Sequence, residues 1–321
     1  MLIGRVQEVW RYPVKSMAGE KLTECSIRSL GIPGDRGWAL RDETAKEMTN
    51  GKRIPLLMQC AARYQGESTN PGSQRGQPAW VDSGRIPHVD ITLPDGTRIS
   101  SDNPQLNARL SEVLDKQVTL WPIQPASNKA HYRRAQKGSR LAGRLGQFSA
   151  FRSTLRTLTR FGNMNAALRE VFSREPGEPI PDISILPPEI LEFTSPPGTY
   201  FDAFPIHVLT TASLETMSKS NPEAVWDVKR FRPNFLIKTE DGIEGLIESG
   251  WAGRKLRLGS VELSCEIPTA RCGMTAHAQA DLPKDPSVLR SIVRDADQNL
   301  GIYASVVTTG KVSTGDVVEL V

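Results

Sequence analysis

Cys272 is the residue of this sequence best placed to do chemistry. It lies in the run PTARCGMTAH (residues 268–277), between an arginine and a glycine, with His277 five residues further on. A neighbouring cation such as Arg271 favours the thiolate, the form that attacks electrophiles and binds soft metals. An inert buried thiol is the alternative, and it suits the other cysteines better because each lies in or beside an apolar or alternating run. These are Cys25, Cys60 and Cys265.

A second group of residues is suited to holding a phosphate. In the run RYPVKS (residues 11–16) a strand pattern ends at proline and delivers Lys15 and Ser16, a charge and an oriented donor. Arg36 could bind the same anion through two hydrogen bonds, or it could simply pair with Asp35. A solvated loop lysine is the commoner outcome, so this group alone predicts only a candidate anion site.

A third group combines an arginine with an amide just before a predicted buried strand. In RFRPN (residues 230–234) Arg232 and Asn234 point to one side of an extended segment, where they could bind the edge of a heterocycle. A salt-bridged strand end is the alternative.

Three hydroxyl residues stand where a strand pattern passes into a helix pattern. Their hydroxyls and the free backbone N–H groups could form an anion site. Simple N-capping of the helix is the alternative, and we expect it for at least one of them. The three are Thr210, Thr211 and Ser213.

The sequence lacks the motifs of several common enzyme classes. It has no P-loop, no GxGxxG after a strand pattern, no HExxH and no GxSxG, which disfavours kinases, dinucleotide oxidoreductases and serine hydrolases. Its four cysteines include no CxxC pair, and its four histidines show no zinc spacing. We therefore expect no disulfide framework and no zinc site made by protein ligands. Bound pyridoxal phosphate is not expected either.

Positive charge is concentrated in one segment. The net charge of the 321-residue chain is +4, yet residues 125–175 hold eleven Lys or Arg against two Glu and so carry +9. Arg152, Arg156 and Arg160 repeat every four residues there, which predicts an amphipathic helix. Such a field could guide an acidic protein, a phosphate-bearing ligand or nucleic acid, whereas a solvated helix face is the commoner explanation.

The elements that must position these residues are mostly short strands. In the first half, alternation and β-branched content predict strands at 6–12, 22–27, 37–41, 90–93, 97–100 and 118–121. The run PDG at 94–96 predicts a hairpin turn, and a helix is predicted over 104–114 with Asn103 as its cap. Residues 176–205 contain eight prolines and read as a long connection without regular helix.

The second half repeats this strand-rich pattern. Strands are predicted at 207–209, 234–238, 256–258, 261–265, 303–308 and 317–321, with helices near 212–218 and from Asp285 onward. Gly259 and Ser260 predict a two-residue hairpin turn, and residues 311–316 a glycine-bearing turn. The pattern predicts a mainly β fold with peripheral helices (α+β), built as two β-barrel-like domains with a helical basic insertion.

Composition places the chain among soluble globular proteins. It is 38% hydrophobic and 24% charged, with no apolar run near the about 20 residues that a membrane helix needs. The start MLIGRVQEVWRYPVK reads as a strand and has no apolar signal-peptide core. We therefore expect no membrane span and a cytoplasmic location.

Taken together, these runs resemble the MOSC family, named after the C-terminal domain of molybdenum-cofactor sulfurase. The match is to the arrangement that includes the mitochondrial amidoxime-reducing component and its bacterial relatives. VWRYPVKSMAG (9–19) resembles the N-terminal barrel domain, while RFRPN, WAGRKLRL (251–258), RC (271–272) and GKVSTGDVVEL (310–320) resemble the MOSC core. The resemblance implies a barrel-like domain over 1–124, a basic helical insertion and Pro-rich connector over 125–200, and a MOSC domain over 201–321.

The resemblance also implies a cofactor and its binding residues. The cofactor would be the molybdenum cofactor (Mo-molybdopterin), with Cys272 as metal ligand and catalytic thiolate. His277 is a candidate proton donor because it lies close in sequence. The residues expected to bind the cofactor are Lys15, Ser16, Arg36, Thr210, Thr211, Ser213, Arg232, Asn234 and Arg271.

The implied reaction is the two-electron reduction of a small N-hydroxylated substrate to an amine or amidine. Met17 departs from relatives, which often have cysteine or another small residue there. The sequence has no cysteine set like that of the iron–sulfur domain fused to some relatives. We therefore expect electrons from a separate protein, a ferredoxin or flavodoxin, docked on residues 125–175.

Two other functions stay open. In one, Cys272 carries a persulfide or passes cofactor to another enzyme, and the sequence cannot separate this from a reductase. In the other, the basic segment binds nucleic acid, which is disfavoured because its aromatic residues form no recognisable stacking platform.

Overall fold

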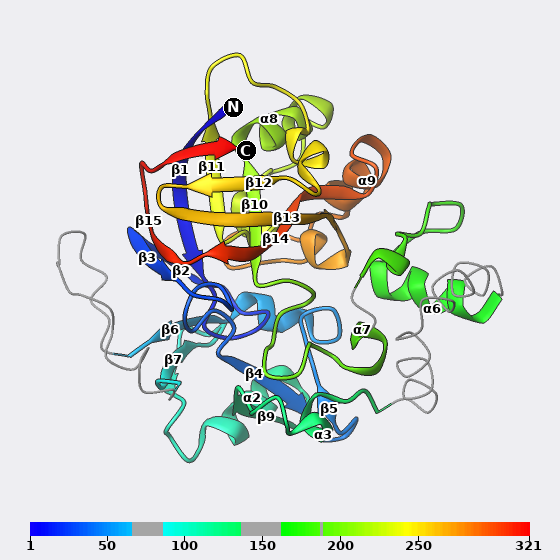
Figure 1. Cartoon of the computed structure of the whole chain (residues 1–321). Coiled ribbons are helices and arrows are strands. Elements are labelled where there is room, and N and C mark those ends of the chain that lie inside the picture. Colours follow the sequence, from blue (N-terminus) through cyan, green and yellow to red (C-terminus); the bar gives the residue numbers. More distant parts are fainter. Residues whose placement is uncertain (66–85, 136–161, 187–188) are drawn as a thin grey trace.

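Two strand-rich halves make up the molecule, one above the other (Figure 1). The computed structural model describes residues 1–65, 86–135, 162–186 and 189–321. The upper half is a barrel, and the lower half holds two small sheets and a helix. The predicted mainly β fold with peripheral helices is confirmed. None of the helices in the described ranges is both long and apolar enough to cross a membrane.

Seven strands close the barrel. The order is β11-β10-β14-β13-β12-β16-β1, and pairing of β1 with β11 joins the two ends. β10 and β11 run parallel, and the other pairs around the ring are antiparallel. The strands are β1 (Leu2–Arg11), β10 (Ile206–Thr210), β11 (Phe235–Thr239), β12 (Lys255–Leu258), β13 (Val261–Ala270), β14 (Asn299–Thr308) and β16 (Val317–Leu320).

The first strand of the chain thus belongs to the barrel formed by the last third of the sequence. Val6 pairs with Ile237 of β11, and Leu2 pairs with Glu319 of β16. β2 (Glu20–Leu22) extends the sheet beside β1, and β3 (Glu24–Ile27) pairs with β15 (Gly310–Ser313). The boundaries predicted at residues 124 and 200 stay a prediction, but they place β1 apart from the strands with which it pairs.

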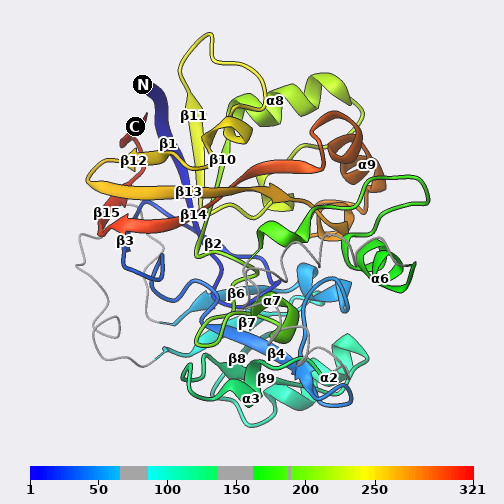
Figure 2. The same ribbon diagram turned by 45° about the vertical axis from the view of Figure 1, so that its right-hand side comes forward.

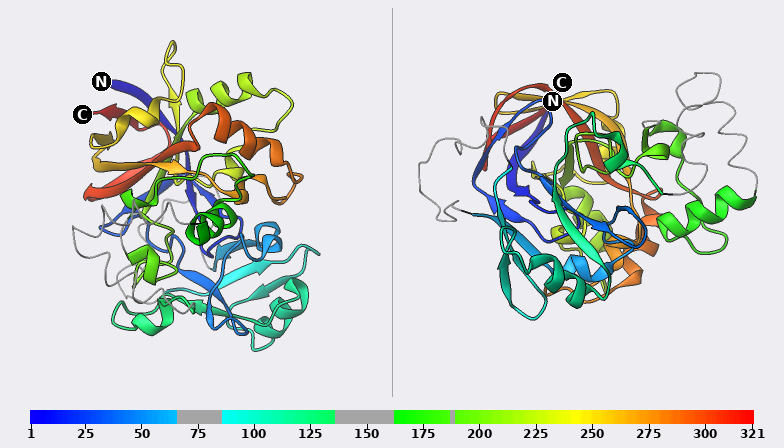
Figure 3. Two further views of the ribbon diagram at one scale, coloured as in Figure 1. Left: turned by 90° about the vertical axis from the view of Figure 1, so that its right-hand side faces the viewer. Right: turned by 90° about the horizontal axis from the view of Figure 1, so that it is seen from below.

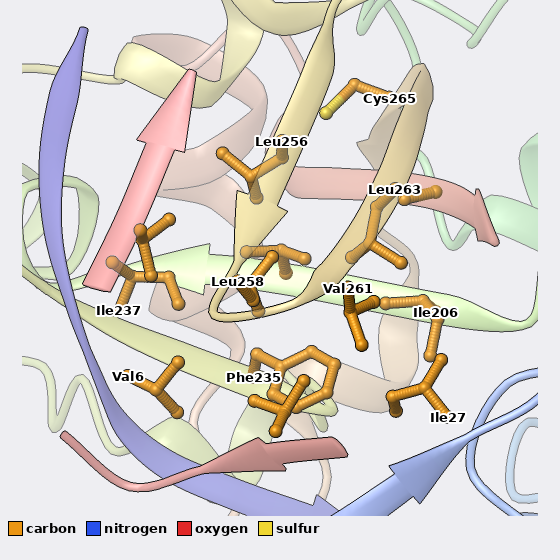
Figure 4. Packing of buried hydrophobic residues seen from close by; sticks show 14 of the residues in the cluster. Val6, Ile27, Ile206, Phe235, Ile237, Leu256, Leu258, Val261, Leu263 and Cys265 are labelled. Atoms are coloured by element: carbon orange, nitrogen blue, oxygen red, sulfur yellow. The ribbon is translucent and has the colours of Figure 1, made fainter. Parts of the chain in front are cut away.

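Alternating side chains fill the barrel. Along β1 the residues Ile3, Val6 and Val9 are buried, and their spacing of three departs from the period of two because the register shifts between Leu2 and Gly4 and between Val6 and Glu8. Figure 4 shows Val6 and Phe235 among the aliphatic side chains that β10, β12 and β13 send into the same interior. The predicted hairpin is confirmed, because Leu258 pairs with Val261 across Gly259, whose φ of 56° suits a tight turn.

Two helices cover one side of the barrel (Figure 2). α8 (Thr211–Ser220) follows β10 directly, and α9 (Pro286–Asp295) begins as predicted, with Asp285 capping it. Both pack on a shared cluster that includes Met217 and Ile292. Short 3-10 helices fill the connections: η3 (Val228–Arg230), η4 (Ile247–Trp251) and η5 (Gly273–Ala276).

Two three-stranded sheets around one core form the lower half. β4 (Trp38–Asp42) pairs with β5 (Glu47–Met48) and β9 (Val118–Pro122); β7 (Val89–Thr92) pairs with β6 (Ala61–Tyr64) and β8 (Arg98–Ser100). α2 (Leu106–Leu114) buries Leu106, Leu110 and Leu114 on this core, with η1 (Pro55–Gln59) beside them. The helix begins at Leu106, two residues later than predicted, and Asn103 Oδ1 accepts a hydrogen bond from the amide of Gln105, the contact expected of the predicted cap.

The segment between the halves forms short helices. They are α3 (Lys129–Tyr132), α6 (Gly162–Phe172), η2 (Ile183–Ile185) and α7 (Glu189–Glu192). In the left panel of Figure 3, α6 (green) lies at the level where the two halves meet. The predicted amphipathic helix with Arg152, Arg156 and Arg160 lies outside the described residues. The turn predicted at 311–316 is partly wrong, since its first residues form β15 by pairing with β3.

Candidate functional site

Cys272 lies just past the end of β13, at the start of η5. Its side chain is half-buried, whereas the three other cysteines are buried. Burial raises the pKa of each of those three thiols to about 12, so they stay protonated. Cys272 is therefore the most accessible of the four thiols.

The main chain around Cys272 is firmly held. Its carbonyl accepts hydrogen bonds from the amide of Thr275 at 3.1 Å and from the Thr275 hydroxyl at 3.0 Å. Arg271, only 9% exposed, donates from Nη2 to the carbonyl of Phe231 at 2.9 Å and stacks on the Phe231 ring. Burial lowers the pKa of Arg271, and the charge of Cys272 opposes that shift.

Positive side chains from both halves gather around Asp202, and one of them, Arg271, also interacts with Cys272. We call this set the basic cluster; its members are Lys15, Arg36, Lys52, Arg232 and Arg271. Tyr303 of β14 joins the two sides, because its phenol interacts electrostatically with Asp202, Arg271, Arg36 and Cys272. Asp202 acts on all five cations and forms an ion pair with Lys15 at 3.0 Å. The cluster thus holds more positive than negative charge.

Lys15 is buried at the junction of the halves. Its ammonium donates to Ser195 Oγ at 2.9 Å and lies 3.4 Å from the carbonyl of Phe201. Burial lowers the pKa of Lys15, and Asp202 opposes that shift. Burial alone would raise the pKa of Asp202, but the charges of Lys15, Lys52 and Arg36 outweigh it and hold that pKa below its usual range. Asp202 is therefore ionised at neutral pH, and the 58% of its side chain that is exposed to water favours the same state.

Arg232 carries a buried donor that has no partner. Its Nη1 donates to the carbonyl of Met17 at 2.5 Å, and its guanidinium lies 4.2 Å from the centre of the Tyr12 ring. Nη2 is buried without a hydrogen bond among the described residues. Burial lowers the pKa of Arg232 to about 10, so it is still charged at neutral pH. A buried, charged, unpaired N–H group is costly, and an anionic ligand would satisfy it.

His207, beside Arg271, packs against the main chain of β14, because a Cβ on Gly301 would clash with its Nε2. Burial and the charge of Arg271 hold the pKa of His207 well below its usual range, so the ring is neutral. The imidazole is therefore enclosed by the protein's own backbone.

Arg36 joins the cluster in a strained backbone. Its φ is 51°, and its Nη1 pairs with the buried carboxylate of Asp35 at 2.5 Å. Asp35 also accepts from the amide of Tyr12 at 2.7 Å. The pairing of Arg36 with Asp35, which the sequence offered as the alternative, is therefore present. The guanidinium also interacts electrostatically with Tyr303 and Asp202.

Two of the predicted cofactor residues act mainly within the protein. Ser16 Oγ accepts from the amide of Gly51 at 2.8 Å. Asn234 accepts from the amide of His207 and donates to the Trp10 carbonyl and to Asp35. The Asn234 amide joins β1, the loop of Asp35 and β10, so its hydrogen-bonding groups are already used.

The three hydroxyl-bearing residues, Thr210, Thr211 and Ser213, lie at the end of β10 and the start of α8. Thr210 caps α8 by accepting from the amide of Ser213, and its own amide donates to Glu248 at 2.6 Å. The Ser213 hydroxyl donates to the same carboxylate, and Thr211 bonds to Thr239. The capping alternative therefore holds for Thr210, and the structure does not bring these three residues to the basic cluster.

His277 is also separate from the thiol. Its carbonyl accepts from Arg230, and the charge that acts on its ring is that of Lys284; burial is the larger cause of its lowered pKa. In the described ranges no contact joins the ring to Cys272, so its role as proton donor stays a prediction based on sequence proximity.

Asp202, Tyr303, Tyr12 and Lys52 are site residues that sequence reasoning missed. Asp202 lies at the end of the proline-rich connection, where no strand or helix pattern gives it a position. Tyr12 was part of the run RYPVKS, but its contacts with Arg36 and Arg232 join segments that are distant in sequence.

A cavity of about 250 Å³ lies behind the basic cluster. Asp35 and Phe201 line it, while the next residues, Arg36 and Asp202, belong to the site. The rest of its wall comes from residues 28–34 and from Ile86, Ile123, Gly198 and Thr199. Because no member of the basic cluster and no cysteine lines it, we place the chemistry at Cys272 and not in this cavity.

The donor set limits how a metal could bind. Among the described residues, no three His, Cys, Asp or Glu side chains come together as metal ligands. A metal at Cys272 would therefore take most of its ligands from a cofactor.

Fold and site together define a class: a two-part β protein in which a barrel presents an accessible cysteine next to buried cations. The family comparison agrees with this architecture. The MOSC N-terminal beta barrel domain matches residues 3–78, and the MOSC domain matches residues 197–319. The chain belongs to the MOSC family, whose domains are in general associated with the molybdenum cofactor.

Several solved structures are similar to the chain. YuaD from Bacillus subtilis is 12% identical, over 99% of this chain and 95% of that one, with a TM-score of 0.39. YiiM from Geobacillus stearothermophilus and YiiM from Escherichia coli are each 18% identical over 36% of this chain, with TM-scores of 0.27 and 0.28. The match spans 53% of each YiiM protein, about half its length. No curated protein matches the sequence.

Proposed function

We propose that this protein binds the molybdenum cofactor and reduces small N-hydroxylated compounds with electrons from a separate protein, such as a ferredoxin or flavodoxin. The observation that supports it most is that the chain combines a half-buried cysteine, Cys272, with a buried arginine, Arg232, whose Nη2 has no partner among the described residues. A thiolate suits a soft metal, and an unpaired guanidinium suits a phosphate or a pterin edge.

The residues fit such a group in type and charge. Cys272 would be the protein ligand to the metal, with Arg271 balancing the added negative charge. Lys15, Arg36 and Arg232 would hold the phosphate and the pterin, because they are the cations drawn from both halves of the chain. When bound, the cofactor supplies the two-electron chemistry.

The protein's own groups orient a substrate beside Cys272. Burial raises the pKa of Tyr303, so its phenol keeps its proton and can donate a hydrogen bond. Asp202 is ionised and can accept one, which suits the N–H groups of an amidine-like substrate. In the described part of the chain Tyr303, unlike His277, interacts electrostatically with Cys272, and Asp202 acts on Tyr303.

A persulfide or cofactor carrier is the second candidate, and the same accessible thiol supports it. The carrier needs a labile sulfur on Cys272 and no turnover, whereas the reductase needs turnover.

Turnover with an artificial donor tests the reductase. Purified holoprotein, a reduced viologen dye and an aromatic N-hydroxyamidine should yield the amidine, and Cys272→Ser should reduce the rate to background. Cys265→Ala changes a buried thiol of the same strand and should retain the activity, so it is the control. Undiminished turnover by Cys272→Ser would contradict the proposal. Protein without turnover that carries cyanide-labile sulfur on Cys272 would support the carrier instead.

A further inference from the structure

The end of α6 reaches the loop of Cys272 from outside the barrel. Ser173 and Arg174 follow the last residue of α6, and Arg174 is only 6% exposed. Gly273 makes room for this approach, because a Cβ on it would clash with Ser173 Oγ. The segment between the two halves therefore packs directly on the residue that follows the thiol.

The guanidinium of Arg174 is fully engaged by the protein. Its Nη2 donates to the carbonyl of Arg271 at 3.0 Å, and its Nε donates to Gln298 Oε1 at 3.3 Å. Its Nη1 donates to the carbonyl of Phe172 at 2.8 Å. Each of the three guanidinium nitrogens thus donates to an acceptor of the protein, which fixes the geometry of Arg174 relative to the loop of Cys272.

These contacts hold the peptide units on both sides of Cys272. The amide of Arg271 donates to the carbonyl of Gln298 at 2.9 Å, while its carbonyl accepts from Arg174. On the other side, the carbonyl of Cys272 accepts from Thr275. Gln298 itself has a φ of 68°, a costly conformation for a residue other than glycine, which surrounding contacts must maintain.

The turn that carries Arg174 rests on the barrel's own helix. Arg290 of α9 donates to the carbonyl of Ser173 and to Glu178, each at 2.5 Å. α6 and α9 lie on the same side of the barrel in both ribbon views (Figure 1, Figure 2). Arg174 thus extends from a turn that is anchored independently of the Cys272 loop.

We propose that Arg174 is a positioning residue for Cys272: through Arg271 and Gln298 it fixes the backbone that directs the thiol toward the basic cluster. The inserted segment, beyond any docking role, then helps to build the site. The consequence for cofactor retention rests on the proposed function, whereas the consequence for backbone rigidity does not.

Three variants of the full-length protein separate this role from a charge effect and from general damage. Arg174→Gln removes the guanidinium and its charge. Arg174→Lys keeps the charge but cannot donate to Arg271 and Gln298 at the same time. Arg169→Gln is the matched control, because Arg169 donates to the carbonyls of Glu175 and Glu178 in the same turn and does not contact the Cys272 loop.

Hydrogen exchange on cofactor-free protein is the first measurement. We expect the amides of Arg271 and Thr275 to exchange about tenfold faster in both Arg174 variants, with β12 unchanged and the Arg169 control like wild type. Wild-type exchange in Arg174→Gln, or full restoration by Arg174→Lys, would overturn the positioning role.

Molybdenum content of the purified proteins is the second measurement. If the wild type holds molybdenum, both Arg174 variants should retain several-fold less, and equal retention would overturn the inference. If the wild type holds none, the proposed function fails and the exchange result alone decides the positioning role.

Discussion

Arg230 and Arg232 stand two residues apart and do opposite things. Arg230 is fully buried, and its donors reach the carbonyls of Val225, Thr275, His277 and Pro283. Arg232 has an unpaired Nη2 among the described residues and a left-handed φ of 54°. The first arginine stabilises the fold, whereas the second keeps a costly donor available.

Substitutions of the two arginines should therefore have different effects on stability and on cofactor binding. Arg230→Gln should lower the free energy of unfolding by about 3 kcal/mol, since several buried carbonyls lose a charged donor. Arg232→Gln should change that free energy in cofactor-free protein by less than about 1 kcal/mol, because removing the unsatisfied Nη2 offsets the lost hydrogen bond from Nη1 to the carbonyl of Met17. The same variant should retain about tenfold less cofactor. Denaturant unfolding and metal analysis measure the two effects, and a reversed pattern would contradict the roles assigned here.

At the residue scale, the sequence indicated the cations but not their partners. Lys15, Arg36 and Arg232 stand within three residues of a proline or glycine near strand ends, a local signal that is visible in one sequence. Ser16 and Asn234 have the same local signal, yet their polar groups bind backbone from distant segments. Long-range contacts decide which polar side chains already have hydrogen-bond partners within the protein. The local sequence pattern does not contain those contacts.

At the element scale, the cap of α8 is a small buried network. Thr210 and Ser213 donate to Glu248, which is 1% exposed. Burial raises the pKa of this carboxyl above its ordinary value of 4.5. The folded protein therefore binds this proton more tightly than the unfolded chain does, so its unfolding free energy falls as pH rises through the raised pKa.

Glu248→Gln should remove this dependence. Relative to wild type, the variant should gain stability as pH rises from 4 to 8, since its neutral amide can still accept from Thr210. Thermal unfolding across that range measures the gain, and a difference that stays constant with pH would contradict it. Molybdenum content should be unchanged, because the cap lies at the end of β10 away from the basic cluster.

Local pattern predicted the elements well where they pair with neighbours in sequence. The β12–β13 hairpin and the start of α9 depend on a turn glycine and an Asp-Pro cap, and both were correct. β15 was missed because its partner, β3, lies almost 300 residues away in the sequence. The pairing of β1 with β11 and β16 could not be predicted for the same reason.

At the scale of the whole molecule, the N-terminal strand completes the C-terminal barrel. Without β1 the facing edges of β11 and β16 would expose unpaired backbone groups and the interior that Val6 and Val9 fill. β1 and β11 approach each other closely at Gly4, because a Cβ there would clash with the carbonyl of Lys238.

A fragment of residues 201–321 should therefore fail to fold alone, although the sequence suggested a separate domain there. Its amide NMR spectrum should lack the dispersion of the full chain, and the fragment should associate through its open edges. Adding a peptide of residues 1–28 should restore part of the dispersion, since it supplies β1 to β3. A well-dispersed spectrum of a monomeric fragment would contradict the shared barrel.

Molybdenum per chain is the measurement that tests the central claim most directly. Elemental analysis of protein from molybdate-supplied cells should give close to one molybdenum per wild-type chain, accompanied by a pterin signature. Cys272→Ser should lose the metal, and Cys265→Ala should keep it because its thiol is buried in the barrel core. Equal molybdenum in wild type and Cys272→Ser, or none in either, would contradict a cofactor site built on Cys272.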